Sequence, residues 1–207
     1  MRRRATIAAL AAALTFGATA QAQAATLAVA GNQSCYRLGD ALIVTGTGFT
    51  PGAPVSFTLD NQDLGSLTAD AAGNISAPLT IGTLRGIRTR TLIATDAANP
   101  ANVATAQFLG SALSVTIRPR SGAAGRKLRI GAAGFTTGRR LYAHVLRKRY
   151  RRNVFIGRLK GPCRTLKVRR SVLPSGLAAG RYTVQFDTKR RYSKSTKVRV
   201  RFRVTVS

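Results

Sequence analysis

The sequence contains no tryptophan, no glutamate and only one histidine, His144. All six acidic residues are aspartates, and the two cysteines, Cys35 and Cys163, lie far apart in the chain. One histidine and two separated cysteines do not supply the four ligands of a tetrahedral zinc site. A serine–histidine–aspartate triad needs a carboxylate beside the histidine, and the half of the chain around His144 offers only Asp187. We therefore expect no catalytic residue, no metal site and no cofactor.

The remaining aspartates lie in predicted turns or at predicted strand ends. They are Asp40, Asp60, Asp63, Asp70 and Asp96. Acid–base catalysis needs two carboxyl groups in different environments, and the spacing of Asp60, Asn61, Asp63 and Asp70 fits no calcium-binding loop. Aspartate side chains in turns commonly accept hydrogen bonds from backbone N–H groups. We expect these five residues to cap turns.

Helical periodicity is absent beyond the first 24 residues. The chain begins with a basic segment, Arg2 to Arg4, followed by an apolar run over residues 5–20 and the small-x-small sequence Ala22-Gln23-Ala24. This order is typical of a cleaved secretory signal peptide, and the apolar run is shorter than the roughly 20 residues that span a bilayer. We expect a signal peptide over residues 1–24, no transmembrane segment in the mature chain, and a secreted or extracellular cell-surface location.

Alternation of apolar and polar residues, the period of a β-strand, dominates the rest of the sequence. It is clearest in residues 197–206, where valines and Phe202 alternate with basic residues. Turn residues separate short strands about every 8–12 residues, which predicts an all-β fold of sandwiches. We expect Tyr182 to form a tyrosine corner, with its hydroxyl bonded to the backbone upstream. The predicted strands are 27–30, 41–49, 55–59, 64–68, 75–81, 89–95, 103–109, 113–118, 127–130, 141–146, 154–159, 166–172, 182–186 and 197–206.

Charge is distributed very unevenly along the chain. Residues 25–110 carry four basic residues and five aspartates, whereas residues 111–207 carry 27 lysines or arginines against Asp187 alone. A change of this size at one point indicates a domain boundary. The sequence predicts a near-neutral domain over residues 25–110 and a strongly basic domain over residues 111–207. Gly110-Ser111-Ala112 is too short a joint for a free linker, so we expect the domains to lie end to end.

Cys35 and Cys163 lie on opposite sides of this boundary. An exported protein can keep a disulfide, and a bridge between these residues would tie the two domains together. Free thiols and an intermolecular bridge are the alternatives that the sequence leaves open.

A short motif occurs once in each half. Gly48-Phe49-Thr50-Pro51-Gly52 matches Gly134-Phe135-Thr136-Thr137-Gly138 at an offset of 86 residues, which indicates duplicated domains. This turn and the loop from Thr68 to Asn74 resemble those of bacterial immunoglobulin-like repeats. The whole mature chain also resembles exported actinobacterial proteins with a basic C-terminal half. The resemblance implies two tandem immunoglobulin-like β-sandwiches that serve as spacers, stalks or adhesion modules, and it carries over no catalytic residue.

The basic residues of the second half provide the main indication of function. Arginine suits bidentate contacts with phosphate or carboxylate, and Tyr150 and Tyr192 are candidates for stacking on bases or sugars. The candidate polyanion-binding residues are Arg147, Lys148, Arg149, Arg151, Arg152, Lys189, Arg190, Arg191, Lys197, Arg199, Arg201 and Arg203. The partners that fit this charge are an anionic cell-wall polymer or an acidic polysaccharide.

The sequence therefore predicts a non-enzymatic exported protein of the cell envelope, or of adhesion type, whose basic C-terminal domain associates with anionic polymers. One alternative is an extracellular nucleic-acid-binding protein, since a field of this size attracts any polyanion, DNA included. The other is a structural spacer whose basic side chains are simply solvated and discourage strand edges from pairing.

Overall fold

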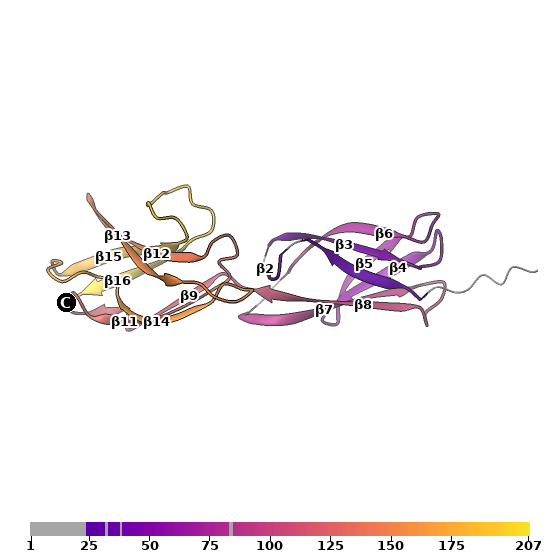
Figure 1. Cartoon of the computed structure of the whole chain (residues 1–207), viewed down its shortest axis with the longest axis horizontal. Helices are drawn as coiled ribbons and strands as arrows, with labels where there is room; N and C mark the ends of the chain where they lie inside the picture. Colours follow the sequence, from indigo (N-terminus) through magenta and orange to yellow (C-terminus); the bar gives the residue numbers. More distant parts are fainter. Residues whose placement is uncertain (1–23, 32, 38, 83–84) are drawn as a thin grey trace, which may run out of the picture.

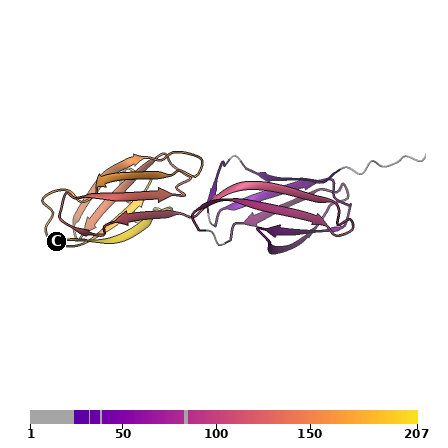
Figure 2. The same ribbon diagram turned by 90° about the horizontal axis from the view of Figure 1, so that it is seen from below.

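The computed structural model describes residues 24–31, 33–37, 39–82 and 85–207, and every regular element in these ranges is a β-strand. Apart from Ala24, the predicted signal peptide lies outside the described residues. Within the same ranges no helix is long and apolar enough to cross a membrane. The strands form four sheets that pack as two sandwiches (Figures 1 and 2), which confirms the predicted all-β fold class.

The first sandwich packs a three-stranded sheet of order β1-β3-β6 against a five-stranded sheet of order β2-β8-β7-β4-β5. Its strands are β1 (Thr26–Ala30), β2 (Tyr36–Arg37), β3 (Ala41–Thr47), β4 (Pro54–Leu59), β5 (Gln62–Thr68), β6 (Ile75–Thr80), β7 (Ile87–Asp96) and β8 (Val103–Ser111). All neighbouring strands are antiparallel except β2, which pairs in parallel with the end of β8.

The second sandwich repeats this topology. Its three-stranded sheet has the order β9-β11-β14, and its five-stranded sheet has the order β10-β16-β15-β12-β13. The strands are β9 (Ser114–Arg118), β10 (Ser121–Gly122), β11 (Lys127–Ala133), β12 (Arg140–Arg147), β13 (Tyr150–Arg158), β14 (Leu166–Ser171), β15 (Gly180–Asp187) and β16 (Val200–Val206). Each strand of the first sandwich thus has a counterpart at the same place in the second.

The repeated motif joins the two sheets of each sandwich. Gly48 and Gly134 have φ values of 81° and 78°, in the left-handed region that favours glycine. Phe49 and Phe135, which follow them, are only 3% and 0% exposed and enter the cores. A β-carbon at Gly134 would lie 2.6 Å from the carbonyl oxygen of Ala112, so a side chain has no room there.

Strand alternation gives each sandwich its own core. In the first sandwich the fully buried residues include Val55 and Leu92. In the second they include Val145 and Phe186. The hydroxyl of Tyr182 donates to the carbonyl oxygen of Ala178 at 2.9 Å, which confirms the predicted tyrosine corner.

The sequence prediction misses two short strands and misplaces several strand ends, such as that of β13, which begins at Tyr150 rather than at Val154. The short parallel strands β2 and β10 were not predicted, because two residues are too few to display alternation. The last strand begins at Val200 rather than at Lys197. Residues 197–199 belong instead to a loop, and a guanidinium nitrogen of Arg199 donates to the carbonyl oxygen of Thr196 in that loop.

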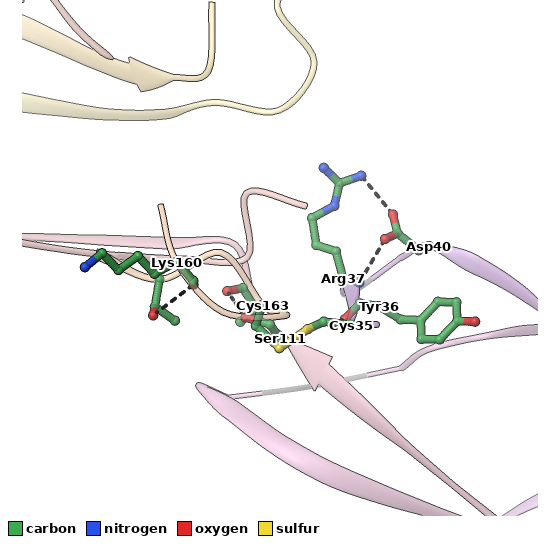
Figure 3. Close-up of a disulfide and its surroundings, with 9 residues drawn as sticks. Cys35, Tyr36, Arg37, Asp40, Ser111, Lys160 and Cys163 are labelled. Atoms are coloured by element: carbon green, nitrogen blue, oxygen red, sulfur yellow. Dashed lines mark hydrogen bonds and ion pairs between the residues drawn. A yellow bond between two sulfur atoms is a disulfide. The ribbon is translucent and has the colours of Figure 1, made fainter. Parts of the chain in front are cut away.

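The two sandwiches lie end to end, and residues 112–113 connect β8 to β9 (Figure 1). A disulfide between Cys35 and Cys163 joins them beside this connection, with the Cα atoms 5.1 Å apart (Figure 3). The structure therefore confirms the interdomain bridge among the alternatives for the cysteines. The N–H of Gly134 donates to the carbonyl oxygen of Cys163 at 2.9 Å, so the repeated motif also supports the bridge.

Candidate polyanion-binding surfaces

All five aspartates of the first sandwich accept backbone N–H groups, and four of them cap turns as predicted, whereas Asp60 accepts its N–H from β7 and pairs with Arg90. The donors are Arg37 for Asp40, Thr91 for Asp60, Gly65 for Asp63, Ala72 and Asn74 for Asp70, and Thr50, Ala98 and Asn99 for Asp96. The hydrogen bond from the N–H of Asn74 is the main reason that the pKa of Asp70 lies below its ordinary value. No three acidic, cysteine or histidine side chains converge as metal ligands within the described ranges. The carboxylates of this half are thus used for folding.

The sixth aspartate, Asp187, belongs to a polar cluster on the outer face of the five-stranded sheet. Cross-strand pairing places Asn153, His144, Gln185 and Arg201 in one row over β13, β12, β15 and β16. His144, Gln185 and Asp187 are all 0% exposed although they point away from the apolar core. They are buried because the loop of residues 188–199 folds back over them. We call this loop the basic loop.

Both ring nitrogens of His144 face oxygen acceptors. Nδ1 lies 2.7 Å from Oδ1 of Asn153, and Nε2 lies 3.0 Å from Oδ1 of Asp187. With the Asn153 amide in this orientation both partners are oxygens, an arrangement that favours the protonated imidazolium ring, which has two N–H donors. With both nitrogens occupied and the ring buried, His144 has no free nitrogen to act as a general base on a serine.

The cluster also anchors the basic loop. Asp187 accepts the N–H of Lys189 at 2.8 Å, and Nε2 of Gln185 donates to Asp187 at 2.7 Å and to the carbonyl oxygen of Ser193 at 3.2 Å. The ring of Tyr192 lies 5.8 Å from the ring of His144, centroid to centroid. These contacts fix the exposed cations of the loop in place over the sheet.

The pKa values of the two charged members are shifted in opposite directions. Burial by itself lowers the pKa of His144, but the hydrogen bonds to Asp187 and Asn153 and the charge of Asp187 outweigh it and raise the pKa above 6.5. Burial likewise raises the pKa of Asp187, but the hydrogen bonds from His144, Gln185 and Lys189 outweigh it and lower the pKa below 3.8. Both shifts therefore favour the charged forms, and the two groups form an ion pair when His144 is protonated.

This ion pair predicts how stability depends on pH. The pKa of His144 is higher in the folded than in the unfolded state, so protonated His144 stabilises the fold fully below pH 6.5. This stabilisation is lost as the pH rises through the folded-state pKa. We expect the free energy of unfolding, measured by urea denaturation, to fall as the pH rises above 6.5. His144 is the only histidine and both cysteines are bridged, so no second histidine and no free thiol contributes to this fall. A His144→Gln variant should lack most of this fall, and an equal fall in both proteins would contradict the prediction.

The structure divides the predicted polyanion-binding residues into two groups. Three have guanidinium groups that donate to acceptors of the protein itself, although Arg201 is also exposed. Arg147 donates to Tyr182 and to the carbonyls of Ala178 and Ala179, Arg199 to that of Thr196, and Arg201 to Oε1 of Gln185. The remaining nine are exposed and form no ion pair with a described carboxylate. They are Lys148, Arg149, Arg151, Arg152, Lys189, Arg190, Arg191, Lys197 and Arg203.

The two predicted stacking tyrosines already contact other aromatic rings. Tyr150 lies edge-on to Tyr182, with the ring centroids 6.3 Å apart. Tyr192 lies between His144 and the guanidinium of Arg151, whose carbon is 5.6 Å from the tyrosine ring centroid. Both rings are half-buried, so they support the hairpin and the basic loop.

The exposed cations of the basic loop surround an open cleft of about 520 Å³. Its lining includes Lys189, Arg190, Arg191 and Lys197 as well as the hydroxyl side chains of Thr188 and Ser195. Strands β7 and β8 of the first sandwich are joined by only six residues, 97–102, whereas the basic loop between β15 and β16 has twelve. The basic loop carries six of the 27 lysines and arginines of residues 111–207, whereas residues 97–102 carry none.

A second basic surface was not among the predicted site residues. It is the outer face of the β9-β11-β14 sheet, which we call the three-strand face. Arg129 on β11 pairs directly with Arg118 on β9 and with Arg169 on β14, so three arginines form one row across the sheet. Lys127 and Lys167 lie beside this row, and all five side chains are exposed. Alternation within each strand predicts that these cations point outward, but only the pairing register brings them into a row.

Comparison with known proteins finds only distant structural similarity. No protein-family model and no curated protein matches the chain. Among solved structures, four tandem repeats from the extending region of a large adhesion protein match with 15% identity and a TM-score of 0.33, over 89% of this chain and 49% of that one. The chain therefore spans about half the length of that structure.

Two further structures have similar scores. A putative membrane-anchored protein from Corynebacterium diphtheriae matches with 12% identity and a TM-score of 0.36, over 89% of this chain and 57% of its own. Trypsin-activated alpha-2-macroglobulin from Escherichia coli matches with 12% identity and a TM-score of 0.41, over 87% of this chain and 18% of its own. Because these scores are low, the function has to be inferred from the residues of the chain itself.

Proposed function

We propose that this chain is a non-enzymatic exported protein of the cell envelope whose second sandwich associates with an anionic polymer. One observation supports this role above the others. The only carboxylate side chain of residues 111–207 belongs to Asp187, which is buried and paired with His144. The exposed cations of this sandwich thus have no carboxylate side chain of their own domain to pair with, and a polyanion would supply the missing charge.

Two features support export and a role outside the cell. The predicted signal peptide directs the chain out of the cytoplasm. The disulfide between Cys35 and Cys163 is the kind of bond that persists in oxidising compartments. Both sandwiches have closed apolar cores, and the single histidine is fully buried. These properties suit a rigid two-part spacer that holds a charged module at a surface.

Salt-dependent binding tests this function. We expect the full chain to be retained at low salt on immobilised teichoic acid and on heparin, with the logarithm of the affinity falling linearly with the logarithm of the salt concentration. Arg85→Gln/Arg88→Gln, which removes two exposed cations from the first sandwich, is the matched control and should be retained like the wild type. A protein that passes through both columns at 50 mM salt would rule out polymer binding, and early elution of the control would show that the second sandwich is not the binding module.

Extracellular nucleic acid remains the second candidate, because phosphate contacts alone would attract it. Recognition of single strands also relies on stacking of bases on aromatic rings, worth about 1–3 kcal/mol for each base. Single-stranded DNA and an abasic strand of equal length separate the two roles. Equal affinity for both strands favours an envelope polymer, whereas a tenfold or larger preference for DNA with bases favours a nucleic-acid-binding protein.

A further inference from the structure

We infer that the three-strand face is the site of polymer binding and that its ligand is a phosphodiester chain of the polyol-phosphate type; this inference rests on the proposed function and assigns its site. The face is defined by Arg118, Lys127, Arg129, Lys167 and Arg169. The three arginines present their guanidinium groups from neighbouring strands. We call Arg118, Arg129 and Arg169 the arginine row.

The arginine row has a geometry that a linear anion can follow. Directly opposed side chains on neighbouring strands have their β-carbons about 4.5–5.5 Å apart, so the row spans about 10 Å. The next row along the strands consists of Thr116, Gly131 and Lys167. Gly131 has no side chain, and the hydroxyl of Thr116 leans over it, 2.6 Å from where a β-carbon would lie. A chain laid along the arginine row would therefore meet no bulky side chain at the centre of the neighbouring row.

The first sandwich provides an internal comparison for this face. Ile43 is the counterpart of Arg129 at the same offset of 86 residues, and it pairs with Ala30 and Pro78. The corresponding row is therefore Ala30–Ile43–Pro78, and it is exposed but uncharged. The positions of Lys127 and Lys167 are taken by Ala41 and Ser76. Because the same sheet forms without any charge at these five positions, the fold does not require the cations.

Two structural explanations do not account for the whole arginine row. Basic residues on edge strands discourage edge-to-edge pairing, which applies to Arg118 on β9 and Arg169 on β14 but not to Arg129, because β11 is the central strand of the sheet. Solubility requires charge on the surface but not like charges directly opposite each other, which destabilise a sheet. The three arginines thus carry an energetic cost in the free protein, and an anion bound across the row would remove it.

The chemistry of the face favours phosphodiester over the other polyanions. The planar fork of arginine matches two oxygens of one phosphate, and a phosphodiester chain repeats this group along its length. The outward residues of β9, β11 and β14 include serine, threonine, glycine and alanine but no aromatic residue on which bases could stack. A polyol-phosphate chain offers phosphates without bases and fits this composition better than a single-stranded nucleic acid does.

The test compares two triple variants of the full chain with equal net charge. Arg118→Gln/Arg129→Gln/Arg169→Gln removes the arginine row, and Arg149→Gln/Arg190→Gln/Arg191→Gln removes three exposed cations from the hairpin and the basic loop. Binding to poly(glycerol phosphate) is measured at 50–200 mM salt. Each lost phosphate contact lowers the salt slope by about 0.7–0.9. We expect the row variant to lose about two to three units of slope and the control less than one.

The outcomes separate this inference from the proposed function. An equal loss in both variants, or a larger loss in the control, overturns the assignment to the three-strand face while polymer binding stands. A wild-type protein that does not bind poly(glycerol phosphate) but binds heparin overturns the phosphodiester ligand. The wild type could instead bind single-stranded DNA more tightly than an abasic strand, and the row variant could lose this preference. That result would overturn the polyol-phosphate chain as the ligand.

A charge-preserving variant keeps the test independent of folding. Arg118→Lys/Arg129→Lys/Arg169→Lys retains all three charges but removes the forked contacts. We expect its salt slope to match that of the wild type while its affinity for poly(glycerol phosphate) falls several-fold. Unchanged affinity would show that these residues act only as point charges and would overturn the bidentate contact. Far-UV circular dichroism and thermal melting confirm that each variant is folded.

Discussion

Asp187→Ala is expected to lower the free energy of unfolding by about 3–5 kcal/mol, the usual cost of removing one partner of a buried ion pair. The carboxylate is 0% exposed and accepts hydrogen bonds from His144, Gln185 and the N–H of Lys189. Without it, the buried imidazolium loses its carboxylate partner, the N–H of Lys189 loses its acceptor, and Gln185 keeps only its hydrogen bond to Ser193. Deprotonation of His144 would relieve only part of this cost.

The same substitution should release the basic loop. Lys189 and Ser193 are held to the sheet through Asp187 and Gln185, so we expect faster amide exchange across residues 188–199 while the core strands remain protected. Urea denaturation measures the loss of stability. Asp63→Ala is the control, because that exposed carboxylate accepts only the N–H of Gly65 and should cost about 0.5–1.5 kcal/mol. A difference of less than 1 kcal/mol between the two variants would contradict the assignment of Asp187 as the centre of the cluster.

The sequence allows the architecture to be predicted largely from local patterns. Alternation in the segments around Leu42, Leu92 and Val184 identifies strands with one buried face, and these residues are indeed core residues. The repeated motif around Phe49 and Phe135 predicts duplication, and the identical strand orders agree with it. The ends of strands are harder to predict from the sequence. Residues 197–199, for example, continue the alternation of β16 but belong to the basic loop.

The candidate sites depend on contacts that local patterns do not contain. The sequence places His144 on the same face as Tyr142 and identifies Asp187 as its only available carboxylate. It does not indicate that the twelve-residue basic loop buries both groups. This loop lies 44 or more residues after His144 in the chain, so no local pattern around His144 predicts the contact. A basic run such as Arg149 to Arg152 can be read directly from the sequence. The arginine row cannot, because its members lie on strands that are separated along the chain by turns and by another hairpin.

The repeated topology separates what the fold requires from what it permits. Positions shared by both sandwiches, such as the glycine and phenylalanine of the repeated motif, serve packing in each. Positions that differ between the sandwiches, such as Ile43 and Arg129, are not needed for packing. The charge of the second sandwich lies on the outer faces of the sheets, in the basic loop and in turns, and not in the apolar core. This distribution is why we attribute it to binding and not to stability.

Replacing both cysteines, Cys35→Ser/Cys163→Ser, is expected to lower the free energy of unfolding by about 4–5 kcal/mol. The bridge closes a loop across a sequence separation of 128 residues, and cross-linking a loop of about 100 residues removes about 4.7 kcal/mol of chain entropy from the unfolded state. The folded state should change little, because the N–H of Gly39 still donates to the carbonyl of Ile81 and Lys160 still pairs with Thr165.

Urea denaturation of the variant and the wild type, each with and without reductant, measures this effect. Since the loss arises in the unfolded chain, the variant should keep the far-UV circular dichroism of the wild type and have a larger m-value, which reflects a more expanded unfolded state. Reductant should bring the wild type to the stability of the variant and leave the variant unchanged. A variant within 1 kcal/mol of the oxidised wild type would mean that the two sandwiches unfold without sharing the constraint, and that the bridge serves only to hold them end to end.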